Sequence, residues 1–206
     1  MKIERLFIYG SGGHAKVIAD MAESLEMPLV AALDQHGTGK VLLDKYPVYT
    51  TVEKEDHDYF IIAVGNNQVR KRISEQELKD CNFAIIKDKS AVISKYAVIK
   101  TGTVIMPGAT VNVDAEIGQH CIINTNASID HDCKIDDYVH ISPNASLAGN
   151  VLVGTGSHIG IGATIIQGVK IGEWCTIGAG AVIIKDVPDG VTVVGNPGRL
   201  IKGKDE

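Results

Sequence analysis

The sequence predicts two domains: a small α/β domain with a parallel sheet over residues 1–88, and a parallel β-helix of six-residue repeats over residues 89–206. Three observations predict this architecture. Strand and helix patterns alternate before residue 90, whereas aliphatic residues recur at every sixth position after it. Glycine accounts for 22 of the 206 residues and aromatic residues for only 5%, a composition that favours many tight turns around an aliphatic core.

The first domain combines short apolar runs with amphipathic segments. Apolar runs predict strands, and apolar residues three and four positions apart predict helices. The expected strands cover residues 5–9, 29–33, 59–64 and 83–86, and the expected helices cover residues 14–25 and 68–78. Alternation at this spacing implies a parallel sheet with crossover helices.

The second domain carries sixteen consecutive Ile, Leu or Val residues at intervals of six, from Ile93 to Ile183. The residue two positions before each is small or β-branched, and both side chains point to the same side of a strand. Three hexads close one triangular coil, so the repeats give about five coils stacked at roughly 4.8 Å. Cys121, Cys133 and Cys175 occupy the second apolar column, which predicts that they lie in the core. Residues 193–201 form a turn that caps the exposed strand edge.

Composition and charge argue against several classes of protein. The net charge of −5 argues against a nucleic-acid-binding protein, because such proteins need a basic surface. No apolar run approaches the roughly 20 residues of a membrane span, and residues 6–9 are too few for a signal-peptide core. The four cysteines form no CxxC pair, which indicates buried thiols and a cytoplasmic protein.

A glycine-rich turn follows the first predicted strand. Gly10, Gly12 and Ala15 fit the pattern G-x-G-x-x-[GA], and Asp34 follows about 20 residues later. The backbone N–H groups of such a turn attract phosphate at a helix N-terminus. A nucleotide-sugar diphosphate meets that need as well as NAD does. The domain is Rossmann-like but holds too few strands for a complete two-halved NAD fold.

Polar residues interrupt the repeats in one segment. His131 stands between Asp130 and Asp132 at or near a corner, and His140 follows with its side chain pointing outward. A histidine beside a carboxylate is an orientable general base, because its pKa lies near the working pH and the carboxylate stabilises the imidazolium.

Three motifs in order resemble one family. The segments YGSGGHAK, AVGNNQVRKRI and INTNASIDHDC, the last followed by VHIS and AGN, resemble the bacterial sialic acid O-acetyltransferases and UDP-4-amino-sugar N-acetyltransferases. The resemblance covers nearly the whole chain and places it among the hexapeptide-repeat acyltransferases. It implies a left-handed β-helix, a homotrimer with active sites at subunit interfaces, and acetyl-CoA as co-substrate without a permanently bound cofactor or metal.

The resemblance also assigns roles to residues of this chain. His131 maps onto the general base and Asp132 onto the acid that raises its basicity. The acetyl-CoA site maps onto His140, Gly149, Ile161 and Ala179. The nucleotide-sugar site maps onto Gly12, Gly13, His14, Asp34, Gln35, Gly65, Asn66 and Asn124. Relatives often carry a second acidic residue after the aspartate, where this chain has Gln35.

The expected activity is therefore transfer of an acetyl group to the 4-amino group of a UDP-linked 4-amino-4,6-dideoxy-N-acetylhexosamine in bacterial glycan biosynthesis. Three alternatives stay open. The acceptor could be a hydroxyl of sialic acid or a related sugar. The chain could be a zinc enzyme like the γ-type carbonic anhydrases, since His140 and His158 lie one predicted coil apart. It could also be a non-catalytic nucleotide-sugar-binding or scaffold protein, which the His131–Asp132 pair argues against.

Overall fold

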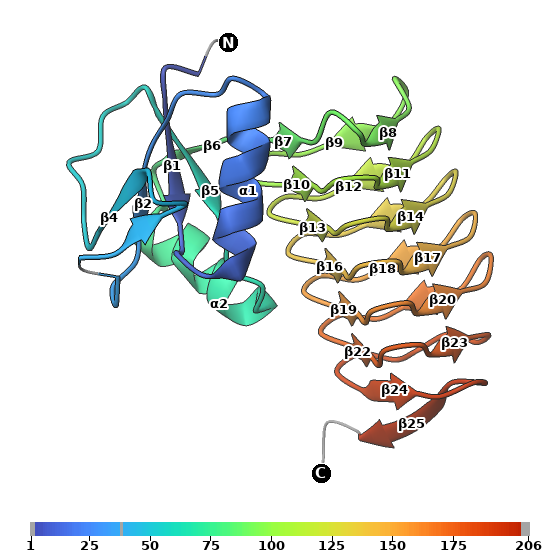
Figure 1. Cartoon of the computed structure of the whole chain (residues 1–206). Coiled ribbons are helices and arrows are strands. Elements are labelled where there is room, and N and C mark those ends of the chain that lie inside the picture. The colour runs from blue at the N-terminus through green and yellow to red at the C-terminus, as the bar shows by residue number, and fades with distance from the viewer. Residues whose placement is uncertain (1–2, 38, 203–206) are drawn as a thin grey trace.

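The computed structural model describes residues 3–37 and 39–202. The expected domain ends at residues 1–2 and 203–206, and residue 38, therefore lie outside the described residues. An α/β domain stands beside a triangular solenoid, which runs from β7 down to the C-terminal hairpin (Figure 1). None of the helices within the described ranges is long and apolar enough to cross a membrane.

The N-terminal domain has a six-stranded sheet in the order β3-β4-β2-β1-β5-β6. Its strands are β1 (Arg5–Tyr9), β2 (Leu29–Leu33), β3 (Val41–Leu42), β4 (Tyr46–Tyr49), β5 (Asp58–Ile62) and β6 (Asn82–Phe83). Its helices are α1 (Gly13–Ser24) and α2 (Asn67–Arg72), and the latter continues into a π-helical turn, η1 (Ile73–Glu77). β1 pairs in parallel with β2 and β5, which confirms the expected parallel sheet with crossover helices.

The sequence patterns missed two strands and misplaced one. β3 and β4 are short, and Pro47 interrupts any alternating pattern in the second. The single strand expected over residues 83–86 is wrong, because β6 pairs with the N-terminal sheet whereas β7 (Ile86–Lys87) pairs with the solenoid. Ala84 joins the two units directly: its N–H donates to the Phe60 carbonyl and its carbonyl accepts from the Gly102 N–H.

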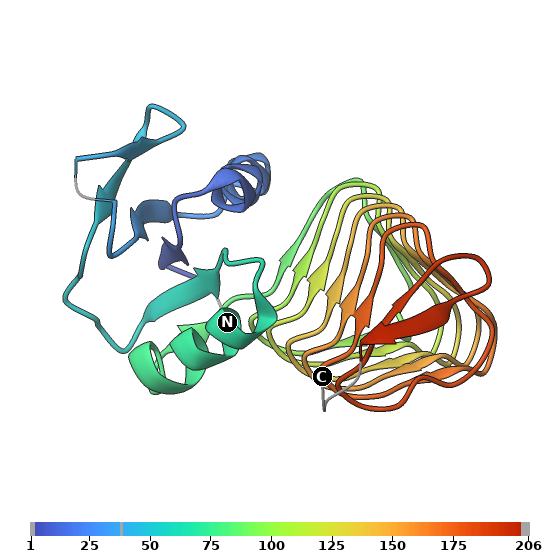
Figure 2. The same ribbon diagram turned by 90° about the horizontal axis from the view of Figure 1, so that it is seen from below.

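The solenoid has three flat faces, which are seen end-on as a triangle in Figure 2. The domain face, which is turned toward the N-terminal domain, contains β7, β10 (Val104–Ile105), β13 (Ile122–Ile123), β16 (His140–Ile141), β19 (His158–Ile159), β22 (Thr176–Ile177) and β24 (Thr192–Val194). The second face contains β8 (Val92–Ile93), β11 (Thr110–Val111), β14 (Ser128–Ile129), β17 (Ser146–Leu147), β20 (Thr164–Ile165) and β23 (Val182–Ile183). The third face contains β9 (Val98–Ile99), β12 (Glu116–Ile117), β15 (Lys134–Ile135), β18 (Leu152–Val153) and β21 (Lys170–Ile171).

Each solenoid strand pairs with the strand 18 residues later, as Ile123 does with Ile141. The predicted period of six and the predicted 18-residue coil are therefore confirmed. The inward columns form one continuous core, in which Cys121, Cys133 and Cys175 are buried as expected. β25 (Arg199–Lys202) pairs antiparallel with β24 and covers the last edge of the domain face, as predicted for a capping segment.

The corners explain the second regularity of the repeat. Every sixth residue from Gly102 to Gly180 has a positive φ, a conformation that favours glycine, asparagine and aspartate. At most corners one of these three residues is present. The corner between the third face and the domain face is different, because it also places His120, Tyr138 and Trp174 in this conformation.

The outward residues of the domain face change from apolar to polar down the solenoid. Ile86, Val104 and Ile122 point outward and pack with buried residues of α1 in a core that the two domains share. The next two outward residues are His140 and His158. The N-terminal domain thus covers the upper coils, and imidazoles begin where that apolar contact ends.

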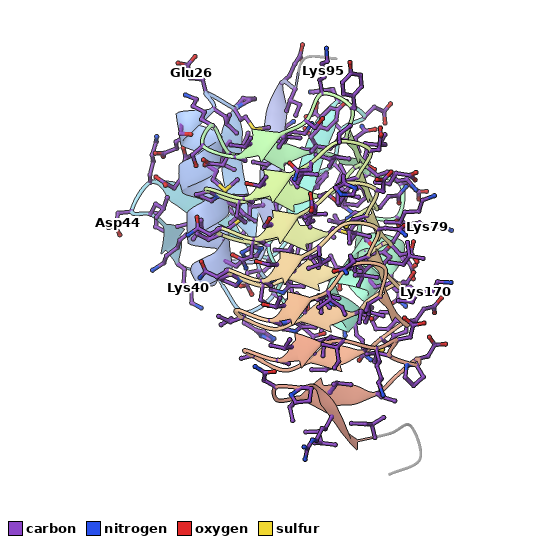
Figure 3. All side chains as sticks on the ribbon, turned by 90° about the vertical axis from the view of Figure 1, so that its right-hand side faces the viewer. Glu26, Lys40, Asp44, Lys79, Lys95 and Lys170 are labelled. Atoms are coloured by element: carbon purple, nitrogen blue, oxygen red, sulfur yellow. The ribbon has the colours of Figure 1, made fainter. Side chains whose placement is uncertain are left out.

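We predict that Ile159→Ala lowers the free energy of unfolding by about 2–5 kcal/mol, because it leaves a cavity between stacked coils. Ile159 is fully buried in the solenoid core. Lys170, which projects from the third face (Figure 3), provides the control, and Lys170→Ala is expected to change stability by less than about 0.5 kcal/mol. Chemical denaturation of both variants measures the difference, and equal stabilities would contradict the account of the core.

Candidate functional site

His131 and Asp132 form a hydrogen-bonded pair at the corner that follows β14. The His131 Nδ1 atom lies 2.7 Å from the Asp132 Oδ2 atom. Asp132 has φ 58°, so the turn needs a residue that tolerates the left-handed region, and aspartate does so while carrying a carboxylate. The corner geometry therefore explains both why an aspartate stands here and why its carboxylate reaches the imidazole.

The pair is exposed, with 54% of the His131 side chain and 59% of the Asp132 side chain open to solvent. The hydrogen bond with Asp132, and next the charge of Asp130, raise the pKa of His131 above its ordinary value. Asp130 is fixed in turn, because its Oδ1 atom accepts from the Asn112 side-chain amide at 2.8 Å. When Nδ1–H donates to Asp132, Nε2 is left free to accept a proton.

Gly149 lies beside the His131 ring, one coil further along the solenoid. A Cβ atom at this position would stand 2.6 Å from the His131 Cε1 atom, so any larger residue would displace the ring. Within residues 3–37 and 39–202, no acceptor is recorded for the Gly149 backbone N–H. This corner therefore combines a base, its carboxylate and an N–H donor, which is a set suited to proton abstraction beside a developing oxyanion.

A second group of polar residues lies on the domain face. The Asn124 Nδ2 atom lies 3.0 Å from the His140 Nε2 atom. Because the Asn124 Oδ1 atom accepts from the Thr125 N–H at 2.8 Å, its Nδ2 atom is the donor to His140. The proton of the neutral imidazole is therefore on Nδ1. Burial first, and then the charges of His158, Arg70 and His14, lower the pKa of His140 to about 3, so the ring is neutral at physiological pH.

His158 belongs to the same group, although the sequence analysis did not assign it a role in acetyl transfer. Its ring stacks on His140 with centroids 4.9 Å apart and an interplanar angle of 13°. Its Nε2 atom lies 2.7 Å from the Ser142 Oγ atom. The 18-residue spacing between the two histidines was the signal that could have identified it. Within the described part of the chain, no group of three or more His, Cys, Asp or Glu residues is placed to hold a metal ion.

The glycine-rich turn leads into α1. Gly12 is the N-cap of this helix and Gly13 its first residue, and a Cβ atom at either would meet nothing within 4 Å. The turn therefore leaves open space at a helix N-terminus, where a phosphate is stabilised. His14 follows, and burial lowers its pKa to about 4.

Asp34 contacts the turn directly. Its Oδ2 atom accepts from the Ser11 Oγ atom at 2.5 Å, and its Oδ1 atom accepts from the His36 N–H at 2.9 Å. These hydrogen bonds, that of Ser11 above all, lower the pKa of Asp34. The Gln35 side chain instead donates to Glu77 at 3.2 Å. Asp34 thus shapes the turn besides being available to a ligand.

The Gly65–Asn66 turn connects β5 to α2. The Asn66 side chain accepts from the Val69 N–H at 3.0 Å and caps the helix, while Gly65 is exposed with open space where a Cβ would stand. The Gly65 backbone is close enough to His140 to affect its pKa. The turn therefore borders the polar group of the domain face.

Ile161 and Ala179 occupy equivalent positions at the corner after the domain face, one coil apart. Ile161 is 58% exposed, and Ala179 is also exposed. An exposed apolar column of this kind suits the extended chain of a pantetheine group, which is only weakly polar.

One chain does not bring all the predicted site residues together. His131, Asp132 and Gly149 lie at the corner between the second and third faces, whereas His140, Asn124 and the Gly65 turn lie at the domain face. The whole second face separates the two groups. The chain therefore presents two half-sites at different corners of the triangle.

Two family models match the chain. The PglD N-terminal domain matches residues 5–76, and the bacterial transferase hexapeptide (six repeats) matches residues 114–149 and 150–185. The UDP-N-acetylbacillosamine N-acetyltransferase of Bacillus subtilis (strain 168) is 44% identical over 112 residues, which are 50% of this chain. The match spans 52% of the length of that relative.

Solved structures match over nearly their full length. The acetyltransferase domain of PglB from Neisseria gonorrhoeae FA1090, in complex with acetyl coenzyme A, is 37% identical with a TM-score of 0.91, covering 98% of this chain and 100% of that one. PerB from Caulobacter crescentus, in complex with CoA and GDP-perosamine, is 31% identical with a TM-score of 0.90, covering 97% and 98%. This chain therefore belongs to the bacterial hexapeptide-repeat acyltransferases, in the family of amino-sugar N-acetyltransferases with a PglD-type N-terminal domain.

Proposed function

We propose that this protein transfers the acetyl group of acetyl-CoA to the amino group of a nucleotide-linked amino sugar. The observation that carries the proposal is the His131–Asp132 pair beside the unpaired N–H of Gly149. The acceptor we propose is the 4-amino group of a UDP-linked 4-amino-4,6-dideoxy-N-acetylhexosamine, for use in bacterial glycan biosynthesis. The sugar-nucleotide acetyltransferases among the relatives support this class of acceptor.

In the proposed mechanism the amine must first lose a proton, because only the neutral amine is nucleophilic. His131 accepts that proton at Nε2, and Asp132 stabilises the imidazolium. The amine nitrogen then forms a bond to the thioester carbon, and the Gly149 N–H stabilises the oxyanion. His140 contacts the acetyl group and has its proton on Nδ1. When the carbon–sulfur bond breaks, the sulfur takes up a proton and CoA leaves as a thiol.

We propose that two copies of the chain complete each site. The base lies one full face away from His140 and the Gly65 turn. A homotrimer, in which the His131 corner of one copy faces the domain face of the next, would join the two half-sites. Ile161 and Ala179 would then line the cleft for the pantetheine chain. We also expect the protein in the cytoplasm.

Thiol release from acetyl-CoA tests the proposed activity. We predict release with a UDP-linked 2-acetamido-4-amino-2,4,6-trideoxyhexose and none with UDP-N-acetylglucosamine, which has no free amine. A GDP-linked 4-amino sugar and free sialic acid serve as further acceptors. Preference for the GDP-linked sugar would refute the choice of UDP, and release with sialic acid alone would replace N-acetylation by O-acetylation.

We predict that His131→Ala lowers kcat by at least about 100-fold, the typical contribution of a general base. His57→Ala is the control, because this exposed histidine contacts only Glu55 in the N-terminal domain. Steady-state kinetics with saturating acetyl-CoA measures both variants. Turnover of the His131 variant near that of the control would contradict its assignment as the base.

We predict that Asp132→Asn lowers the pKa of His131 toward its ordinary value, because the Asp132 hydrogen bond is the largest cause of the upward shift. The imidazole should then stay neutral to lower pH, while kcat falls because the imidazolium formed in the reaction loses its partner. NMR titration of the His131 ring protons measures the pKa directly. An unchanged pKa would show that the carboxylate does not act on this ring.

A further inference from the structure

Arg70 on α2 is a cation buried between the two domains. Only 1% of its surface is exposed. No carboxylate forms an ion pair with it within the described ranges 3–37 and 39–202. A buried charge is costly unless hydrogen bonds replace the water that it loses. The partners of this guanidinium therefore show what the charge does.

The guanidinium binds three acceptors of the N-terminal domain. Its Nη1 atom donates to the Val64 carbonyl at 2.9 Å and to the Gly65 carbonyl at 3.2 Å. Its Nη2 atom donates to the Asn67 Oδ1 atom at 2.8 Å. One side of Arg70 thus holds the turn that begins α2.

The other side of the guanidinium binds the solenoid. The Nε atom donates to the His120 carbonyl at 2.7 Å, and Nη2 donates to the Tyr138 carbonyl at 2.7 Å. Asn67 extends the contact, because its Nδ2 atom donates to the Gly156 carbonyl at 2.9 Å and to the Ser157 carbonyl at 3.1 Å. Arg70 and Asn67 lie three residues apart, which places them on one side of the helix.

The solenoid acceptors belong to one corner of three successive coils. His120, Tyr138 and Gly156 are 18 residues apart and all have positive φ. No backbone N–H is recorded as donating to their carbonyls within the structurally described residues. In the open corners of the solenoid, water can bind such carbonyls. At this corner α2 excludes water, so the carbonyls need protein donors. Arg70 and Asn67 supply them.

We propose that Arg70, together with Asn67, is a positioning residue that holds the Gly65–Asn66 turn at a fixed distance from His140 and Asn124. The inference rests on the proposed function, in which the turn binds the sugar nucleotide and the domain face binds the acetyl group. α1 packs against the upper coils through apolar contacts, which resist separation but are not directional. The five hydrogen bonds of Arg70 are directional and fix the register between the turn and the coils.

The electrostatics support this role for Arg70. After burial, the positive charge of Arg70 contributes to the lowered pKa values of His14 and His158. It also contributes to that of His140, after burial and His158. Arg70 is thus near all three imidazoles beside the turn, and it favours their neutral form.

The experiment compares Arg70→Lys, Arg70→Met and Asn67→Ala with Arg72→Met. Arg72 is on the same helix with its side chain 56% exposed, and its ion-pair contact with Glu77 is 4.0 Å long, so its loss should change no parameter by more than about twofold. We expect Arg70→Met to raise KM for the sugar nucleotide by between about 10-fold and 100-fold, because misplacement of a binding group has effects of this size. Arg70→Lys, which keeps the charge but not the fork of donors, should have a smaller effect. KM for acetyl-CoA should change by less than about twofold, since its cleft lies outside the contact.

A merely structural role would lower the amount of folded enzyme, and therefore kcat, at unchanged KM values. That result would overturn the proposal, as would equal effects on both KM values. Asn67→Ala keeps the buried charge paired with its backbone acceptors. If the Arg70 variants do not fold, its KM for the sugar nucleotide decides between the two accounts.

Hydrogen exchange separates this proposal from the proposed function. Backbone amides at and just after the Gly65–Asn66 turn should exchange faster in Asn67→Ala and Arg70→Lys than in Arg72→Met, whatever substrate the enzyme uses. If no acceptor is acetylated but this exchange increases, the activity is wrong and the positioning of the turn stands. Unchanged exchange would overturn the positioning role even in an active enzyme.

Discussion

The backbone hydrogen bonding of each coil to the coil 18 residues away is the constraint on which the rest of the structure depends. It requires apolar side chains at the two inward positions of every hexad and a residue that tolerates positive φ at every corner. It also aligns equivalent positions of successive coils into columns. His131 and Gly149 belong to one such column, and the stacked rings of His140 and His158 belong to another. The geometry of both half-sites therefore follows from the repeat.

The N-terminal domain uses the same columns. Its helix α1 packs on the apolar outward residues of the upper coils, and the Arg70 guanidinium binds the free carbonyls of one corner column. These two contacts differ in kind, because the first is non-directional and the second is directional. Together they place the glycine-rich turn and the Gly65 turn beside the imidazoles of the domain face. A binding domain for one substrate is thereby held against a scaffold for the other.

Much of the fold could be predicted from the sequence because its signals are local and periodic. The hexad columns predicted the solenoid, its buried cysteines and its capping segment, and apolar runs predicted β1 and β2 with their observed bounds. The strand break between Phe83 and Ile86 could not be predicted, since both halves are apolar and only tertiary contacts assign them to different sheets. The His131–Asp132 contact was expected from neighbouring residues. The buried contacts of Arg70 join residues 50 and 68 positions apart, and no sequence pattern marks such pairs.

The central claim is that each active site combines the His131 corner of one copy with the domain face of another. Mixed assemblies test it most directly. A His131→Ala chain and a chain with His14 and His140 both replaced by alanine are each expected to be almost inactive, and they are refolded together in equal amounts. If the half-sites meet between copies, random mixing restores about a quarter of the wild-type sites, and activity should recover to about that level. If one copy contained the whole site, every site in the mixture would carry a defect, and no recovery above the separate variants would be seen.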